Sequence, residues 1–502
     1  MTWLRAFHGC IVFSVLAVAA ASGQHPMPAG MGIDPNTVAA YEKLGAVYGR
    51  IGKAEDPFFH DGRDYAEKAM PAFRLKNFPK STFPDVAVPF ALDLAFTAVT
   101  DGELKELGRL KNLAALNLSH TKVTDAGLKE LADLTNLTTL DLTYTHVTDV
   151  GLKELASLKN LSTLYLNYTR VTDAELKELA RLQNLTRLHL VGTKVTDAGL
   201  EELAGIKKLS MLFLNYTPVT DAGLKKLAAF KNLATLNLTY TTVTDAGLKE
   251  LAGLTNLSEL YLEGTNVTDA GLKGLAGLTH LTTLDLLGVH VTDVGLKQLA
   301  DLKNLATLNL SHTSVTDAGL QELVGLNNLT TLYLALLKVT DTGLKELAGL
   351  KNLTTLDLRD TRLTDAGLRE LAGHRKLACL TLTNTNVTDA GLKELAGLTN
   401  LAELRLAHTN VTDVGLKELA GLKNLTTLQV FGGRVTDAGV KELAGLSNLT
   451  TLYLNYTRVT DAGLKDLARL KNLTALYLNR TQATAHGVAE LRKALPKCEI
   501  SH

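Results

Sequence analysis

The sequence from Val123 to His146, VTDAGLKELADLTNLTTLDLTYTH, is repeated with small changes through most of this 502-residue chain. The triplet Val-Thr-Asp returns every 24 residues from Val99 to Val459, with one copy altered to Leu363-Thr364-Asp365. A decayed copy, Ala483-Thr484-Ala485, closes sixteen full units that contain no insertion or deletion. A period of about 20 to 50 residues predicts a solenoid, in which each unit buries its apolar face only against its neighbours.

Each unit contains two periodicities. Thr124 and Asp125 predict a helix start, because both side chains can accept hydrogen bonds from the free N–H groups of the first turn. The apolar residues that follow have helical spacing: Leu128, Leu131, Ala132 and Leu134. Further on, apolar and polar residues alternate as in a short strand with one buried face, at Leu137, Leu140 and Leu142. Strand, helix and strand in tandem predict parallel strands on the inside of an arc and helices outside.

The pattern Leu137-x-x-Leu140-x-Leu142-x-x-Thr145-x-Val147 resembles the leucine-rich repeat, with threonine where that family usually has asparagine or cysteine. The Thr-Asp-Ala-Gly-Leu opening resembles the ribonuclease-inhibitor-like branch, particularly the cysteine-containing repeats of F-box substrate receptors and their bacterial relatives. The match runs from about Phe90 to the C-terminus. The resemblance implies an α/β leucine-rich repeat solenoid, a horseshoe with parallel strands on the concave face and short helices on the convex face. It also implies a protein-binding function without chemistry of its own.

The chain divides into four predicted parts. Residues 1–23 have the form of a secretory signal peptide, with an apolar run from Ile11 to Ala21 that is too short to span a membrane as a stable helix. Residues 24–89 form a proline-containing leader and N-terminal cap, residues 90–482 the array of 24-residue units, and residues 483–502 a C-terminal cap. A cap is expected because the open core of the first unit must be covered.

Within the N-terminal cap, Asp34-Pro35 predicts a helix start. We expect the helical stripe to continue through Val38, Tyr41, Leu44, Tyr48 and Ile51, and we expect an extended segment between Met70 and Phe78. At the other end, Pro496 to Ile500 approximates a last strand.

Composition excludes several functional classes. Lys plus Arg and Asp plus Glu number 52 each, and this balance argues against a nucleic-acid or anionic-membrane partner. The repeated aspartates and the scattered histidines provide no ligand spacing for a metal, and there is no glycine-rich phosphate loop or nucleophile elbow. Cys379 and Cys498 lie five strands apart, which is too far for a disulfide. We therefore expect no enzyme, no cofactor and no metal.

The aromatic residues point to a binding surface. Most tyrosines fall at positions where the strand side chains would face outward, on the concave side of the arc, where tyrosine offers a large contact area and a polar tip. Cross-strand stacking is the structural alternative. The candidate ligand-binding residues, with the charged residues that interrupt the row, are Tyr144, Tyr165, Tyr168, Arg187, His189, Phe213, Tyr216, Tyr240, Tyr261, Tyr333, Arg359, Arg405, Phe431, Tyr453, Tyr456 and Tyr477.

The leading hypothesis is a non-catalytic scaffold that is secreted or held in the cell envelope or periplasm, without a transmembrane segment in the mature chain. Its concave face would bind a protein. A cell-wall or carbohydrate binder is an alternative, because exposed tyrosines also stack on sugar rings. A ubiquitin-ligase substrate receptor is disfavoured, since no F-box-like domain precedes Phe90. A purely structural spacer at the cell surface is the remaining alternative.

Overall fold

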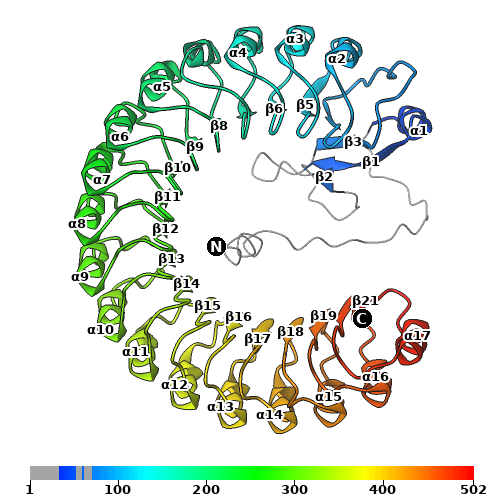
Figure 1. Ribbon diagram of the computed structural model, residues 1–502, viewed down its shortest axis with the longest axis vertical. Coiled ribbons are helices and arrows are strands. Elements are labelled where there is room, and N and C mark those ends of the chain that lie inside the picture. The colour runs from blue at the N-terminus through cyan, green and yellow to red at the C-terminus, as the bar shows by residue number, and fades with distance from the viewer. Residues whose placement is uncertain (1–32, 52–58, 61–69) are drawn as a thin grey trace.

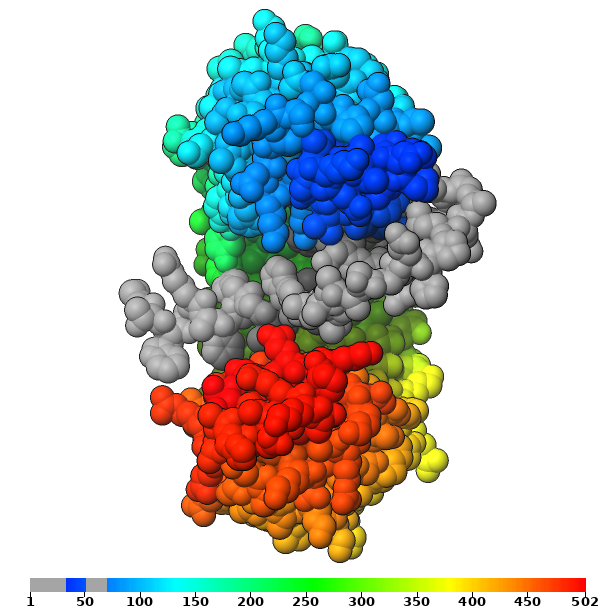
Figure 2. Space-filling model, turned by 90° about the vertical axis from the view of Figure 1, so that its right-hand side faces the viewer, coloured from blue at the N-terminus to red at the C-terminus, as the bar shows by residue number. Residues whose placement is uncertain are grey.

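The chain folds into a curved solenoid, described by the computed structural model over residues 33–51, 59–60 and 70–502. The predicted signal peptide lies outside the described residues. Parallel strands line the inside of the arc and helices cover its outside (Figure 1). Figure 2 looks into the opening of the arc, where the N-terminal end in blue and the C-terminal end in red face each other. The predicted fold class is confirmed.

The strands of the array are short and follow one another at the 24-residue period. They are β4 (Phe90–Asp93), β5 (Leu113–Asn117), β6 (Thr139–Asp141), β7 (Thr163–Tyr165), β8 (Arg187–His189), β9 (Met211–Phe213), β10 (Thr235–Asn237), β11 (Glu259–Tyr261), β12 (Thr283–Asp285), β13 (Thr307–Asn309), β14 (Thr331–Tyr333), β15 (Thr355–Asp357), β16 (Cys379–Thr381), β17 (Glu403–Arg405), β18 (Thr427–Gln429), β19 (Thr451–Tyr453), β20 (Ala475–Tyr477) and β21 (Glu499–Ser501).

The convex side carries one helix in nearly every unit. The α-helices are α2 (Asp101–Leu107), α3 (Asp125–Leu128), α4 (Asp149–Leu155), α5 (Asp197–Glu202), α6 (Asp221–Leu227), α7 (Asp245–Glu250), α8 (Asp269–Leu272), α9 (Asp293–Leu296), α10 (Asp317–Leu320), α11 (Asp341–Glu346), α12 (Asp365–Glu370), α13 (Asp389–Glu394), α14 (Asp413–Glu418), α15 (Asp437–Leu443), α16 (Asp461–Leu467) and α17 (Ala485–Ala494). Single 3-10 turns extend several of them, at Lys129–Leu131, Leu203–Gly205, Leu251–Gly253, Lys273–Leu275, Lys297–Leu299, Gln321–Leu323, Leu347–Gly349, Leu371–Gly373, Leu395–Gly397 and Leu419–Gly421.

Strand register places equivalent residues of successive units side by side. Leu140 pairs with Leu164, and Tyr165 pairs with His189. The repeated leucines and valines therefore stack into one hydrophobic core that runs from Ile33 to Ile500, and most of them have no exposed surface. The threonine that stands in place of the usual asparagine or cysteine closes the loop, since the hydroxyl of Thr145 donates to the carbonyl oxygen of Leu142 at 2.6 Å.

The repeated aspartates link neighbouring units, which corrects the expectation that each caps its own helix. Thr124 does cap α3, accepting from the backbone N–H of Ala126 at 3.3 Å. The carboxylate of Asp125, however, accepts from the next unit, from the N–H of Thr148 at 2.8 Å and from its hydroxyl at 2.6 Å. The same two bonds recur in every unit, from Asp101 with Thr124 to Asp461 with Thr484. We call this series the Asp–Thr bridge.

The bridge also explains the repeated glycine of the helix start. A Cβ at Gly151 would lie 2.5 Å from Oδ1 of Asp125, which is closer than non-bonded atoms approach. Glu175 occupies this position in the following unit, and there the α-helix is replaced by a 3-10 helix at Leu176–Arg181. Glycine is therefore favoured at this position because a side chain has no room there, and not because the backbone is left-handed.

A small N-terminal subassembly packs against the first unit. It comprises α1 (Pro35–Lys43), β1 (Ala46–Ile51), β2 (Phe59–His60) and β3 (Met70–Leu75). Strand β1 pairs antiparallel with β2 and β3, and β3 begins the parallel sheet beside β4. The ring of Tyr41 is fully buried, stacks on Phe73 at 3.9 Å and meets Phe90 edge-on.

Two predictions for this segment are confirmed and one is wrong. Asp34 caps α1 by accepting from the N–H of Thr37, and the expected extended segment is β3. The helix does not continue to Ile51, because Gly45 adopts φ +87° and the chain then forms β1. After β20, the chain forms α17 and then β21, which pairs parallel with β20. Cys379 and Cys498 are both free, as the spacing predicts.

Candidate functional site

The concave face combines uniform buried positions with variable outward positions. In β8 the central Leu188 is fully buried, whereas Arg187 and His189 on either side are half-buried and face the inside of the arc. Outward residues of adjacent strands lie in register, so each outward row is continuous along the arc. The variation between units is therefore displayed on one continuous surface.

One aromatic row lies on the strands. Tyr165, His189 and Phe213 stack face to face, with ring centroids 4.2 and 4.1 Å apart. Burial, together with the neighbouring Arg187 charge, lowers the pKa of His189 to about 3. His189 is therefore neutral at physiological pH and acts as an aromatic member of the stack. At the far end of the sheet, Tyr453 and Tyr477 stack at 4.4 Å in the same way.

A second aromatic row lies in the turns that follow the strands, which corrects the prediction that these residues belong to the strands. Strand β6 ends at Asp141, and Tyr144 lies in the turn beyond it at φ +55°. The predicted binding residues that lie in this row are Tyr144, Tyr168, Tyr216, Tyr240 and Tyr456. Tyr144 stacks on Tyr168 at 4.4 Å and Tyr216 on Tyr240 at 4.8 Å.

The left-handed backbone of this row is costly for such side chains. Thirteen non-glycine residues adopt φ between +54° and +62°, all at the same position of the unit. A left-handed conformation costs a non-glycine residue roughly 1–2 kcal/mol, and bulky residues are rarely found there. Gly192 and Gly432 show that the turn accepts residues without this penalty. A bulky side chain at an energetically unfavourable backbone angle in a surface turn is a candidate for a functional role.

The middle of the concave face is acidic. Glu259, Glu263 and Asp285 lie on and just after β11 and β12. The phenol of Tyr240 donates to Oε1 of Glu263 at 2.9 Å. Burial raises the pKa of Asp285 to about 6, and the nearby charge of Glu263 adds to the effect. Burial beside Glu259 likewise raises the pKa of Tyr261.

The arginines of the second half are paired with carboxylates on their own strands. Nε of Arg359 donates to Asp357 at 2.7 Å, and Arg405 pairs with Glu403. Tyr333 is half-buried on β14, the strand next to Asp357. These ion pairs reduce the net charge that this part of the face offers to a partner.

The last candidates form a loose aromatic group near the C-terminal end. Phe431 lies two residues beyond β18 and 6.4 Å from Tyr456, with the ring planes tilted. The guanidinium of Arg480 lies over the ring of Tyr456 at 5.9 Å. Together with the stacked rings of Tyr453 and Tyr477, these residues form a second aromatic area on the arc.

The sequence analysis overlooked two members of the turn row. Phe96 stacks on His120 at 4.2 Å, and His120 stacks on Tyr144 at 4.5 Å. Phe96 is 76% exposed, more than any other large apolar side chain among the described residues. The 24-residue spacing from Phe96 to Tyr144 was the signal that could have identified them.

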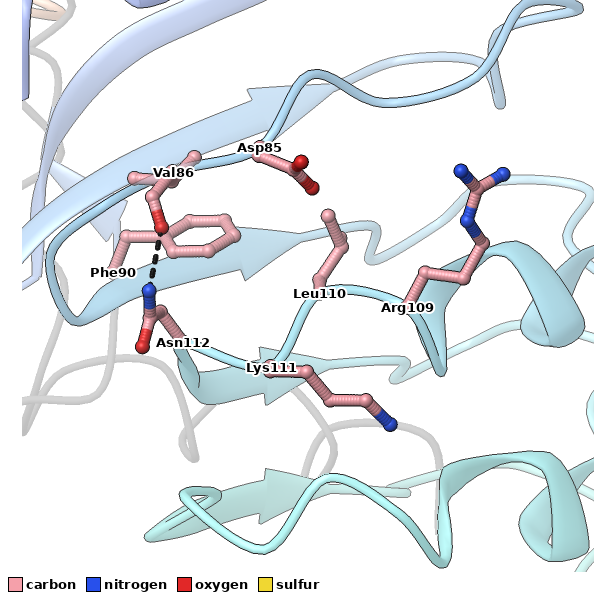
Figure 3. A pocket seen from close by; sticks show the side chains of 7 residues that line it. All are labelled: Asp85, Val86, Phe90, Arg109, Leu110, Lys111 and Asn112. Carbon is pink, nitrogen blue, oxygen red and sulfur yellow. Dashed lines mark hydrogen bonds between the residues drawn. The ribbon is translucent and has the colours of Figure 1, made fainter.

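Other features of the described residues offer no reaction chemistry. A hollow between the N-terminal segment and the first unit is lined by Asp85, Phe90 and Arg109, and Asn112 Nδ2 donates to the carbonyl of Val86 at its edge (Figure 3). Within the described ranges, no three His, Cys, Asp or Glu residues are grouped so as to hold a metal ion. None of the helices described has the length and apolar character of a membrane span.

A solenoid of parallel strands and short helices, with a variable concave face and a leucine core, defines a leucine-rich repeat scaffold. The sequence matches the family described as "Leucine-rich repeat region" over residues 90–320 and again over residues 251–500, so the chain belongs to this family. None of the curated proteins matches the chain.

Solved structures of leucine-rich repeat proteins are similar to it. An internalin (inlF) from Listeria monocytogenes is 26% identical, with 70% of this chain and 91% of the internalin covered and a TM-score of 0.50. A leucine-rich repeat protein from Leptospira interrogans is 26% identical over 82% of this chain and 89% of its own, with a TM-score of 0.48. The ectodomain of the Arabidopsis receptor kinase HAESA, solved with a peptide hormone ligand, is 17% identical over 80% and 75% of the two chains, with a TM-score of 0.42.

Proposed function

We propose that this chain is an exported, non-catalytic binding protein whose concave face holds a folded protein partner. The observation that supports the proposal most directly is the contrast across each strand of the sheet. Inward positions are leucine in unit after unit, whereas outward positions present the Tyr165–His189–Phe213 stack, the acidic middle and a second aromatic area. Within the stack Tyr165 is buried, and His189 and Phe213 are half-exposed. Aromatic side chains surrounded by varied polar groups are typical of recognition surfaces.

The geometry of the stacks argues for a protein and against a sugar. Stacking on a sugar ring needs an exposed aromatic face. Both faces of His189 are covered, by Tyr165 and by Phe213, at 4.2 and 4.1 Å. The stack offers mainly ring edges and polar tips to the inside of the arc, and these suit the mixed surface of a protein.

Finer assignments belong to the same proposal. The 24-residue period and the helix in nearly every unit support placement in the ribonuclease-inhibitor-like branch, among bacterial relatives of the cysteine-containing repeats. Residues 1–23 are proposed as a signal peptide and residues 24–89 as a leader and cap. The burial of Tyr41 against Phe73 supports the capping role. Intact-mass measurement of the protein from its own host should show the loss of about two dozen residues, and a chain that retains Met1 would refute export by this route.

The concave site is tested by comparing two variants in a pull-down from the surroundings of the native host, followed by titration of the captured protein. Phe213→Ala combined with Tyr261→Ala removes two half-exposed rings from the face and leaves the leucine core intact. Central aromatic anchors commonly contribute ~2 kcal/mol or more to binding, so we expect at least a ~30-fold loss of affinity. Lys249→Ala on the convex helix α7 is the matched control and should bind as the wild type does. Equal affinity of the concave variant and the wild type would refute the proposal.

A further inference from the structure

We propose that one edge of the horseshoe, separate from the concave face, binds an extended acidic segment of a partner protein. The surface consists of two parallel columns in the turns that follow β4 to β8. One column is aromatic, Phe96, His120, Tyr144 and Tyr168, and the other is basic, Lys122, His146, Arg170 and Lys194. We call it the aromatic–basic edge.

The aromatic column is built by the fold and held at unfavourable backbone angles. Its four residues have φ between 54° and 60°, where other units place Gly264, Asp360 or Asn384. The rings follow each other at 4.2, 4.5 and 4.4 Å. Gly192 comes next in the column, and a Cβ there would lie 2.4 Å from Cε1 of Tyr168. The ring of Tyr168 therefore occupies the space that a side chain at position 192 would need, and the aromatic column ends at Tyr168.

Stacking determines which part of the rings meets solvent. Interior ring faces are covered by neighbouring rings, whereas the edges stay accessible, with Tyr144 47% and Tyr168 40% exposed. An aromatic ring carries partial negative charge on its face and partial positive charge at its edge. A column of stacked rings therefore presents edges that favour carboxylates over cations.

The basic column reinforces this preference. All four side chains are exposed, and none forms an ion pair with another residue of the described ranges. The turns that carry them, residues 119–122, 143–146, 167–170 and 191–194, contain no carboxylate. The carboxylates that begin the next helices are already occupied. Asp125, for example, accepts two hydrogen bonds from Thr148.

The continuous run of basic residues ends at Lys194. In the next three units the position of the basic column is taken by Pro218, Thr242 and Asn266, and Glu263 lies beside the last of these turns. Basic residues return later at this position, at His290, Lys338, Arg362, Arg434 and Arg458, but among the described residues only the first run lies beside a continuous stack of rings. From Phe96 to Lys194 the surface crosses four strand spacings, about 19 Å at ~4.8 Å each. An extended peptide of five or six residues, at ~3.3–3.6 Å per residue, matches that length. The size and charge therefore fit a short acidic stretch of a protein partner.

A direct test measures fluorescence anisotropy with a labelled dodecapeptide, four repeats of Glu-Asp-Gly with blocked ends, on the full chain. Two edge variants are compared with the wild type. One replaces Lys122, His146, Arg170 and Lys194 by Gln, and the other combines Tyr144→Ala with Tyr168→Ala. The matched control replaces four exposed convex lysines by Gln: Lys129, Lys249, Lys345 and Lys393. We expect the basic-column variant to lose at least 10-fold in affinity, the tyrosine variant several-fold, and the convex control nothing.

Each alternative outcome overturns the proposal. If the convex control loses as much affinity as the basic-column variant, the attraction is nonspecific. If the wild type binds a sulfated polysaccharide such as heparin and ignores the peptide, the surface belongs to an anionic glycan. The Phe213→Ala, Tyr261→Ala variant separates this proposal from the concave site. If that variant no longer binds the acidic peptide and the edge variants bind it normally, the peptide-binding surface is the concave face and not the edge.

Discussion

Gly295→Ala in α9 should destabilise the array, although alanine is the better helix former. In an unobstructed helix this change gains up to ~1 kcal/mol. At Gly295 the new Cβ would lie 2.3 Å from Oδ1 of Asp269 and 3.1 Å from Cδ1 of Leu272. Relieving the contact moves the carboxylate that Thr292 binds at 2.7 and 2.6 Å. Overpacking costs ~1–3 kcal/mol and each lost hydrogen bond ~1 kcal/mol, so we expect a net loss of about 2–3 kcal/mol.

The effect should be local, because each unit of a solenoid contacts only its neighbours. Hydrogen exchange followed by mass spectrometry should show at least ~30-fold faster exchange in peptides around residues 269–295, since 1.4 kcal/mol corresponds to a factor of ten. Gly102→Ala is the control for an unobstructed helix position. It lies in α2 one residue before the place of the repeated glycine, which Glu103 occupies there, and the nearest atom to a new Cβ is 4.0 Å away.

Gly102→Ala should stabilise its helix by about 0.5 kcal/mol. Adding Asp269→Ala should remove most of the further penalty of Gly295→Ala, because the clashing oxygens are gone. Equal stabilisation by both glycine substitutions would show that the close approach across the unit boundary does not limit this position.

Three further predictions concern buried groups. Tyr41→Ala should destabilise the first units by about 3–5 kcal/mol, because the ring that stacks on Phe73 is removed, and hydrogen exchange should rise there and not in distant units. His374 is fully buried, its Nε2 donates to the carbonyl oxygen of Leu347 at 3.0 Å, and burial lowers its pKa. The unfolded chain therefore takes up a proton at this residue first, and stability should fall as pH drops below ~6.5, by up to ~1.4 kcal/mol per pH unit. Thermal unfolding of His374→Leu should lack this slope. The pKa of Asp285 is raised to about 6 in the folded protein. As pH rises from 4 past 6, the unfolded chain loses this proton more readily than the folded protein does, so stability should fall. Asp285→Asn should therefore raise the melting temperature at pH 8 but not at pH 4.

The repeat made most of the fold predictable. The alternation of apolar and polar residues identified strand and helix in each unit, and the 24-residue period gave the register that places Tyr165 beside His189. The partner of Asp125 was not predictable. A carboxylate at a helix start is suited equally to its own first turn and to a donor of the next unit, and only the packed structure shows which is nearer.

The site was less predictable because the turn carries no local signal. Glycine or asparagine usually marks a position where the backbone is left-handed. Here Tyr144 and Tyr168, with large rings, occupy that position. Alternation alone therefore extended the strand by three residues too many. The helix from Pro35 was overextended for a different reason. Gly45 was available as a stop signal, but the apolar spacing up to Ile51 also fitted a helix.

The Asp–Thr bridge has a consequence for how such a chain can change over evolutionary time. Every boundary from Asp101 to Thr484 has the same hydrogen bonds, so the bridge itself places no restriction on which unit follows which. Recombination that duplicates or deletes the coding segment of one 24-residue unit would leave each aspartate opposite a threonine from which it can accept its two hydrogen bonds. A change that is not a whole number of units would leave a carboxylate opposite the wrong backbone group. Gene duplication can therefore adjust the circumference of the arc, and with it the opening in Figure 2, in steps of one unit.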